Sequence, residues 1–264
     1  MFSKKKFVYG LLFGVAAATL AFELLVEKRN AEGQDTLVVG MMSGYPPFMS
    51  LNESGQPEGF DVDVANEIGQ RLGKKIVIKD MGVAELLIGL QQKKIDVVLS
   101  GLSITKERQN KINMIYYQGE PIKTAPLLFW KEIPAGVNSL EDLRGKNATV
   151  CVEPGSSWEN FLAPYTFFEK KLVSKYLDMV FEIRQGKALA ALFDPEIVGE
   201  FLAKFPELKV LEVPLGDFSI DGNGIGIGKD NPALTANLQK IVTELRQGGT
   251  ISALENKWFK KGAA

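Results

Sequence analysis

Short apolar runs alternate with longer amphipathic segments from residue 36 onward, and this alternation is typical of a mixed α/β fold. The short runs predict buried strands, because they are bounded by polar or turn residues and are too brief for helices. The predicted strands are residues 36–41, 76–78, 95–99, 125–130, 148–152, 189–193, 209–213 and 224–228. Cys151 lies inside one of these runs, and as the single cysteine it is expected in the core.

Apolar residues recur at helical spacing between the strands. They repeat every four positions over 60–72 and stop at Gly73, which predicts a helix with a glycine C-cap. A similar face predicts a helix at 83–90. Another helix is expected over 233–246, where an asparagine and a proline supply the start signal, and a last helix ends at Trp258.

Two segments that contain glycine divide this pattern, and we interpret residues 119–124 and 216–223 as hinge crossings. The chain would then build one lobe, cross to a second lobe, and return to complete the first. This interpretation places residues 34–120 plus 222–264 in lobe 1 and residues 125–218 in lobe 2.

The N-terminus carries an export pattern. Three lysines precede an apolar stretch within residues 1–26, as in a signal peptide, which predicts a periplasmic protein. Cleavage after Ala21 would leave 28 basic and 32 acidic residues, a net charge of −4. The alternative is an uncleaved N-terminal anchor, although Glu23 interrupts the apolar stretch.

Charge and composition restrict the possible functions. The formal net charge of the whole chain is −1, which gives no net electrostatic attraction to nucleic acid. Nucleic acid is therefore not expected as a partner. The chain has no histidine, which removes Ser/His and Cys/His nucleophile pairs and the commonest zinc sites. No metal or organic cofactor is expected.

Candidate binding residues follow the ends of predicted strands, where open α/β sheets bind ligands. Tyr45 lies in a proline-rich turn after the first strand, and Ser100, Gly101 and Ser103 follow the third. Arg108 lies one turn into the next helix. Backbone N–H groups together with a guanidinium suit a carboxylate, although an arginine in this position is also common on a solvated surface.

Two later strand ends add further polar groups. Ser157 and Trp158 follow the strand at 148–152, and Asp194 follows the strand at 189–193. Asp194 is either the N-cap of the next helix or the counter-charge for an ammonium group. Together with Arg108 on the other lobe, it would suit a zwitterion held between the lobes.

Four segments resemble one protein family, the polar amino-acid family of bacterial extracytoplasmic solute-binding proteins, which are the receptors of ABC importers. The segments are residues 44–48, 59–65, 95–108 and 257–259. The resemblance implies a non-enzymatic, two-lobed periplasmic-binding-protein fold in which each lobe has a central sheet flanked by helices, with two hinge strands. It also implies an amino-acid ligand, lobe closure as the transport signal, and a permease with its ATPase as partners.

The resemblance also implies roles for individual residues. Arg108 would hold the ligand carboxylate with help from Ser103 and Ser157, and Asp194 would hold the α-ammonium. The pocket around the ligand side chain would consist of Tyr45, Ser100, Gly101, Glu153, Trp158, Met42 and Val83.

Three pocket positions depart from the pattern expected for basic ligands. Members that bind basic amino acids usually have an aromatic residue where Val83 stands, and they often have an acid where Met42 stands. Glu153 instead falls where members place a residue that faces the end of the ligand side chain. A buried carboxylate needs a cationic partner, so we expect arginine or another basic amino acid, unless Glu153 is solvated or pairs with a lysine.

Two other functions compete with this interpretation. The chain also resembles cyclohexadienyl dehydratases, in which Glu153 could serve as a general acid. Alternatively, an uncleaved N-terminal segment would make the chain a membrane-tethered amino-acid sensor. For the transport receptor we expect a monomer.

Overall fold

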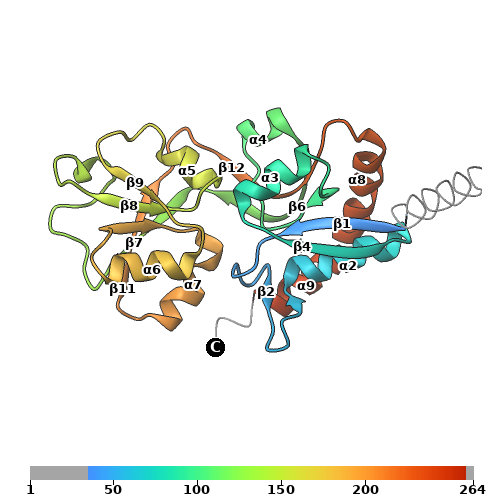
Figure 1. The fold of residues 1–264 in the computed structure, drawn as a ribbon, viewed down its shortest axis with the longest axis horizontal. Coiled ribbons are helices and arrows are strands. Elements are labelled where there is room, and N and C mark those ends of the chain that lie inside the picture. The colour runs from blue at the N-terminus through green and yellow to red at the C-terminus, as the bar shows by residue number, and fades with distance from the viewer. Residues whose placement is uncertain (1–34, 260–264) are drawn as a thin grey trace, which may run out of the picture.

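The computed structural model describes residues 35–259, which form two lobes joined by extended strands (Figure 1). Each lobe has a central five-stranded sheet with helices packed against it, as expected for the α/β periplasmic-binding-protein fold. The export segment expected at residues 1–26 lies outside the described residues. Within residues 35–259, no helix is both long enough and apolar enough to cross a membrane.

The first lobe contains a sheet with the strand order β4-β1-β5-β12-β6. Its strands are β1 (Thr36–Met41), β4 (Lys75–Asp80), β5 (Val97–Val98), β6 (Asn113–Ile122) and β12 (Ile220–Ile227). β1 is parallel to β4 and β5, whereas β12 is antiparallel to β5 and β6. A short hairpin is formed by β2 (Ser50–Leu51) and β3 (Pro57–Glu58).

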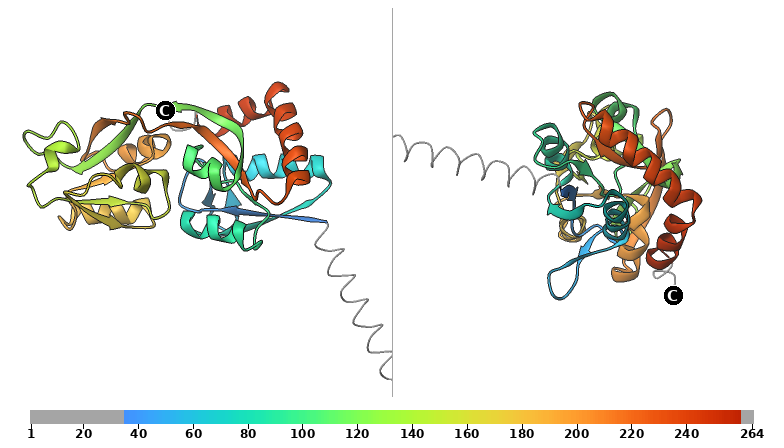
Figure 2. Two further views of the ribbon diagram at one scale, coloured as in Figure 1. Left: turned by 90° about the horizontal axis from the view of Figure 1, so that it is seen from above. Right: turned by 90° about the vertical axis from the view of Figure 1, so that its right-hand side faces the viewer.

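Helices cover both faces of this sheet (Figure 2). One face packs against α2 (Phe60–Leu72), α8 (Pro232–Gln247) and α9 (Thr250–Trp258). The opposite face packs against α3 (Val83–Gln91), through Leu86 and Leu90, and α4 (Lys106–Lys111) packs against β6.

The second lobe contains a sheet with the strand order β11-β7-β10-β8-β9. Its strands are β7 (Thr124–Trp130), β8 (Thr149–Val152), β9 (Glu169–Leu172), β10 (Ala190–Leu192) and β11 (Leu208–Pro214). α6 (Tyr176–Arg184) and α7 (Pro195–Lys204) share one apolar cluster. α5 (Ser157–Leu162) and a one-turn 3-10 helix, η1 (Glu141–Leu143), pack on the other face.

The two lobes are connected by extended chain rather than by loose loops. A single residue, Lys123, separates β6 from β7, and β12 pairs with β6 from Ile220 onward. The pairing is irregular next to Gly222, whose φ of 80° is a left-handed conformation that glycine adopts readily. Figure 2 shows both strands running side by side between the lobes.

Several local predictions are confirmed. β1 and α2 have the expected bounds, and Gly73 ends α2 in the left-handed conformation. Asn231 caps α8 by accepting a hydrogen bond from the Leu234 backbone, and Cys151 is fully buried. The prediction missed β6, β9 and the β2–β3 hairpin, and it made the strand at 95–99 longer than β5.

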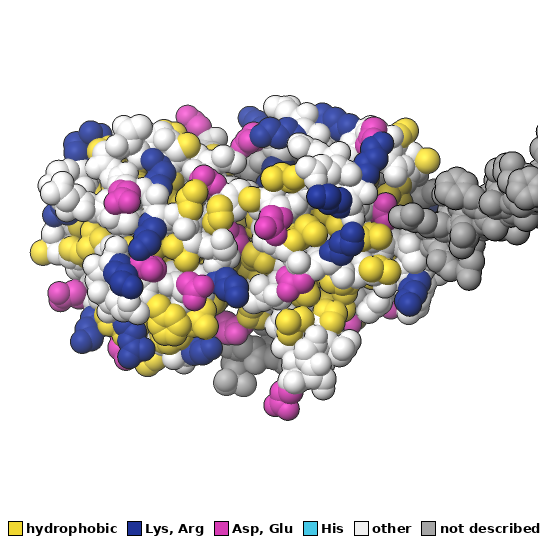
Figure 3. Space-filling model, viewed as in Figure 1, with side chains coloured by type: hydrophobic (Ala, Val, Ile, Leu, Met, Phe, Trp, Pro, Cys, Tyr) yellow, Lys and Arg dark blue, Asp and Glu magenta, His cyan; other side chains and the backbone are white. Residues whose placement is uncertain are grey.

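The surface carries charges of both signs. On the face in Figure 3, Lys and Arg side chains are interspersed with Asp and Glu side chains over both lobes. This face therefore has no extended single-sign patch of the kind that binds nucleic acid.

Candidate functional site

A small cavity lies between the lobes, and all eleven residues that the sequence singled out line its wall. Three further residues complete the lining: Leu102 and Ser156, which lie within the strand-end segments that the sequence singled out, and Tyr176, which sequence reasoning missed.

The cavity is built from strand ends of both lobes. In the first lobe, Met42 directly follows β1, and Ser100 lies two residues after β5. Glu153 and Asp194 occupy the corresponding places after β8 and β10 of the second lobe. Because the carboxyl ends of parallel strands share one sheet edge, the two lobes present their polar loops to each other.

Asp61 of α2 holds the loop that contains Gly101 in the first lobe. Its carboxylate accepts hydrogen bonds from the Gly101 backbone N–H and from the Tyr117 hydroxyl, both at 2.7 Å. Burial raises the pKa of Asp61 to about 7, although both hydrogen bonds oppose this shift. The Ser100 hydroxyl in turn accepts a hydrogen bond from the Met42 backbone, so the loop is tied to the end of β1.

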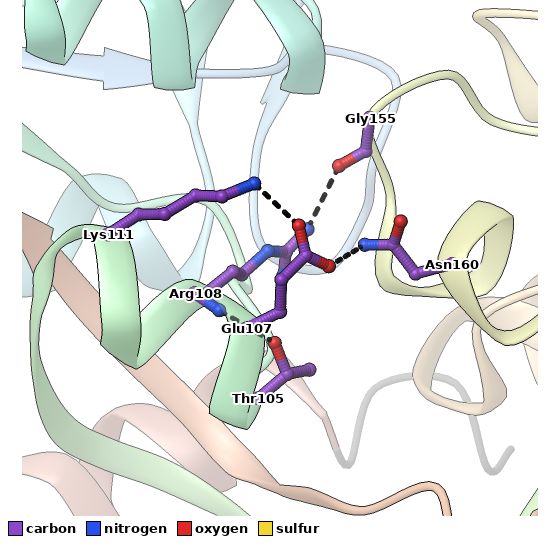
Figure 4. Close-up of polar contacts among 6 residues, drawn as sticks. All are labelled: Thr105, Glu107, Arg108, Lys111, Gly155 and Asn160. Atoms are coloured by element: carbon purple, nitrogen blue, oxygen red, sulfur yellow. Dashed lines mark hydrogen bonds and ion pairs between the residues drawn. The ribbon is translucent and has the colours of Figure 1, made fainter.

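Arg108 points from α4 across the cavity (Figure 4). Thr105 caps this helix and accepts a hydrogen bond from the Arg108 backbone. The guanidinium donates to the Ser103 carbonyl at 2.9 Å and to the Gly155 carbonyl of the other lobe at 3.2 Å. Burial lowers the pKa of Arg108 to about 10, and the charge of Glu153 opposes this, so the group stays cationic at neutral pH.

Further contacts join the lobes beside Arg108. The Ser157 hydroxyl donates to the Ser103 hydroxyl at 3.2 Å, inside the cavity. Nearer the surface, the Asn160 amide of α5 donates to Glu107 of α4, and Glu107 also pairs with Lys111 (Figure 4). These polar contacts hold the two loop regions against each other.

The N-cap role considered for Asp194 is confirmed. One carboxylate oxygen caps α7 by accepting from the Glu196 backbone at 3.0 Å, and the other accepts from the indole of Trp158 at 3.3 Å. Asp194 also lines the cavity, and burial raises its pKa. An ammonium group beside it would favour the ionised form.

Glu153 is the least satisfied polar residue of the site. Its side chain is buried, with 4% of the residue exposed, and Oε2 accepts from the Tyr176 hydroxyl at 3.3 Å. Among residues 35–259, Oε1 is the one buried side-chain nitrogen or oxygen atom with no hydrogen-bond partner. Burial raises the pKa of Glu153 to about 8. A buried acceptor without a donor is costly, which points to a ligand group at this position.

Aromatic rings from both lobes meet at this end of the cavity. Tyr45 stacks on Phe48 within the first lobe and on Tyr176 of the second lobe, with ring centroids 5.0 Å and 5.8 Å apart. Tyr176 is packed in turn against Phe193 at 5.0 Å. Val83 contributes an aliphatic wall. Tyr176 therefore adds a second tyrosine ring at this end of the cavity, although it does not follow a strand end and gave no signal in the sequence.

Comparison with known proteins agrees with this geometry. Residues 37–261 match the model of the bacterial extracellular solute-binding proteins, family 3. A probable ABC transporter arginine-binding protein of Chlamydia trachomatis is 33% identical over 232 residues, which cover 86% of this chain and 88% of that protein. The lysine/arginine/ornithine-binding periplasmic protein of Escherichia coli K12 is 31% identical, with 94% of each chain covered.

A solved structure shares the fold. The crystal structure of a mutant of ArgBP from T. maritima aligns with a TM-score of 0.77 and 29% identity, covering 88% of this chain and 98% of the other. The matched residues span both lobes and the cavity between them. This chain belongs to the bacterial extracellular solute-binding proteins of family 3.

Proposed function

We propose that this protein is the extracytoplasmic receptor of an ABC importer and that it binds arginine, or another basic amino acid, between its two lobes. Its similar curated relatives are transport binding proteins and not enzymes, which supports a binding protein. Amino-acid transport proteins are among its relatives, and two of them are named for arginine and for lysine, arginine and ornithine.

The cavity offers both groups that an α-amino acid requires. Arg108 is a buried cation with Ser103 and Ser157 beside it, which suits the ligand carboxylate. Asp194 is a buried carboxylate on the other lobe, which suits the α-ammonium. Binding of a zwitterion would therefore involve charged groups of both lobes and would favour their closure.

The observation that carries the choice of ligand is the unpartnered Oε1 of Glu153. With both carboxylates ionised, Arg108, Asp194 and Glu153 sum to a charge of −1. A basic amino acid has a net charge of +1 and would leave the site neutral. A neutral amino acid would supply no cation to Glu153, which would then stay protonated at neutral pH, because burial raises its pKa to about 8, and would contribute no ion pair.

Among the described residues, the Glu153 carboxylate has little contact with bulk solvent and no lysine partner. Only 4% of the residue is exposed. In the part of the chain that the structure describes, the ion pairs within 4 Å do not include Glu153, so it has no lysine partner. A cationic group of the ligand therefore remains the natural complement of this carboxylate.

Thermal melting against the twenty amino acids tests this proposal. At about a hundred times the dissociation constant, a ligand adds about 2.7 kcal/mol to the free energy of unfolding, or roughly 5–10 °C in Tm for a chain of this size. Arginine or lysine should give the shift, and Glu153→Gln should remove most of it. Glu132→Gln, an exposed change in the same lobe, is the control. A shift with glutamine or an apolar amino acid and none with arginine or lysine would contradict the proposal.

The remaining features of the receptor are also proposals. We place hinge motion at residues 119–124 and 216–223, between a lobe of 34–120 plus 222–264 and a lobe of 125–218. The partners would be a permease and its ATPase, and the receptor would act as a monomer.

We propose a periplasmic location after cleavage of the N-terminal segment. N-terminal sequencing of exported protein tests this, since an intact first residue would favour the anchored sensor.

The dehydratase alternative is separated by a direct assay. Incubation with prephenate and arogenate should leave both compounds unchanged, whereas new aromatic absorbance would indicate dehydration.

A further inference from the structure

Tyr176 stands at the point where the two lobes and the ligand side-chain pocket meet. It begins α6 of the second lobe, is 3% exposed, and lines the cavity beside Glu153. Its hydroxyl donates a hydrogen bond to one oxygen of the Glu153 carboxylate, whose other oxygen has no hydrogen-bond partner among residues 35–259. A cation held by that free oxygen would therefore lie next to the Tyr176 ring.

The Tyr176 ring also faces a second ring from the opposite lobe. Its plane is tilted by 22° from that of Tyr45, and the ring centroids are 5.8 Å apart. A cation within about 6 Å of an aromatic centroid is attracted by the ring face. Both rings are backed by phenylalanines, Phe48 behind Tyr45 and Phe193 behind Tyr176, which restrict their movement.

We propose that Tyr176 is a specificity-determining residue that makes the site prefer a guanidinium over an ammonium. This inference rests on the proposed function. The ring would supply the second aromatic wall, which the aliphatic Val83 does not supply, from the opposite lobe. Because Tyr176 stacks on Tyr45 in this structure, a guanidinium would separate the two rings as it binds. Planar guanidinium groups stack on aromatic faces and donate through a rigid fork, whereas an ammonium is a compact, strongly hydrated charge. Both rings would therefore contact the guanidinium only when the lobes close.

Two substitutions separate the ring from its hydroxyl. Tyr176→Phe keeps the ring and removes the bond to Glu153, so affinities for arginine and lysine should both fall by about three- to tenfold, with their ratio unchanged. Tyr176→Leu also removes the ring, so arginine binding should fall by a further factor of about ten while lysine binding changes much less. Calorimetric titration of each variant with L-arginine and L-lysine measures both ratios.

Tyr165→Leu is the matched control, because Tyr165 lies in the same lobe within an aromatic cluster away from the cavity. It should leave the arginine-to-lysine ratio unchanged. An unchanged ratio in Tyr176→Leu, or an altered ratio in Tyr176→Phe, would overturn the inference. If Tyr176→Leu does not fold, the arginine-to-lysine ratio of Tyr176→Phe remains the test, and an altered ratio in that variant would overturn the inference. A wild-type protein that binds no basic amino acid would instead reject the proposed function.

Discussion

Arg108 illustrates how a single side chain serves both the fold and the proposed site. Its two terminal nitrogens donate to backbone carbonyls, one on its own lobe and one on the other. These carbonyls are neutral acceptors, so the positive charge of the guanidinium has no carboxylate within 4 Å in the described chain. A ligand carboxylate would supply the missing counter-charge through a bidentate contact.

Arg108→Ala should abolish amino-acid binding while the protein still folds. Two charge-assisted hydrogen bonds, at about 1.5–3 kcal/mol each, correspond to a loss of more than a hundredfold in affinity. Isothermal titration calorimetry measures the loss, and circular dichroism checks the fold. Lys106→Ala, an exposed change on the same helix, should bind normally. Wild-type affinity in Arg108→Ala would remove Arg108 from the site.

At this scale strand ends located from apolar runs predicted eight of the residues that line the cavity, and the family resemblance added Met42, Val83 and Glu153. Asp194, for example, directly follows a predicted strand. Tyr176 could not be found in this way. It begins a helix after a polar segment, and only the packing of α6 against the second sheet brings its ring to the cavity. That placement is a tertiary effect and leaves no local pattern.

Among the elements, α3 of the first lobe lies close to the loop before α5 of the second lobe. Gly155 has a φ of 74°, and a Cβ atom built on it would lie 2.7 Å from the Ala84 Cα. Real Cβ atoms do not approach backbone so closely, and backbone cannot move aside as a flexible side chain can. The present contact between α3 and this loop therefore requires glycine at position 155.

Gly155→Ala should hinder lobe closure and weaken ligand binding by at least tenfold. Gly136→Ala is a matched control, because Gly136 lies in the same lobe with a φ of 77° but has no atom within 4 Å of a built Cβ. Both variants carry the same backbone strain, so only the clash differs. Calorimetry measures affinity, and small-angle X-ray scattering measures the compaction caused by ligand. Equal behaviour of the two variants would show that the contact does not limit closure.

The predicted elements were most accurate where one face is continuously apolar. α2 repeats every four residues and ends at a glycine, so both of its ends could be read from the sequence. β9 has the sequence Glu-Lys-Lys-Leu at the edge of a sheet, where little apolar burial is needed, and it was missed. β6 was missed because its glycine and proline indicate a break, although pairing with β12 keeps it extended.

For the molecule as a whole, buried carboxylates take the place of histidine as groups that titrate near neutral pH. The chain has no histidine. Burial raises the pKa of Asp61 to about 7 and those of Glu153 and Glu196 to about 8. Glu196 accepts hydrogen bonds from Gln118 and Asn223, on the two strands that join the lobes. Protonation of Glu196 would therefore change its hydrogen bonds to the two strands that join the lobes.

Arginine binding should release protons and should strengthen as pH rises toward about 8. At pH 7 the ligand-free Glu153 is mostly protonated, since its pKa is about 8. A guanidinium beside it favours the carboxylate and lowers that pKa, and an ammonium beside Asp194 acts in the same direction, while Arg108 remains charged. Lowering the pH from 8 to 6 should therefore weaken binding, because protons compete with the ligand. Calorimetry at pH 7 in buffers of different ionisation enthalpy counts the protons released. Glu153→Gln should reduce that number, and a binding enthalpy that is the same in every buffer would refute the linkage between ligand charge and these buried carboxylates.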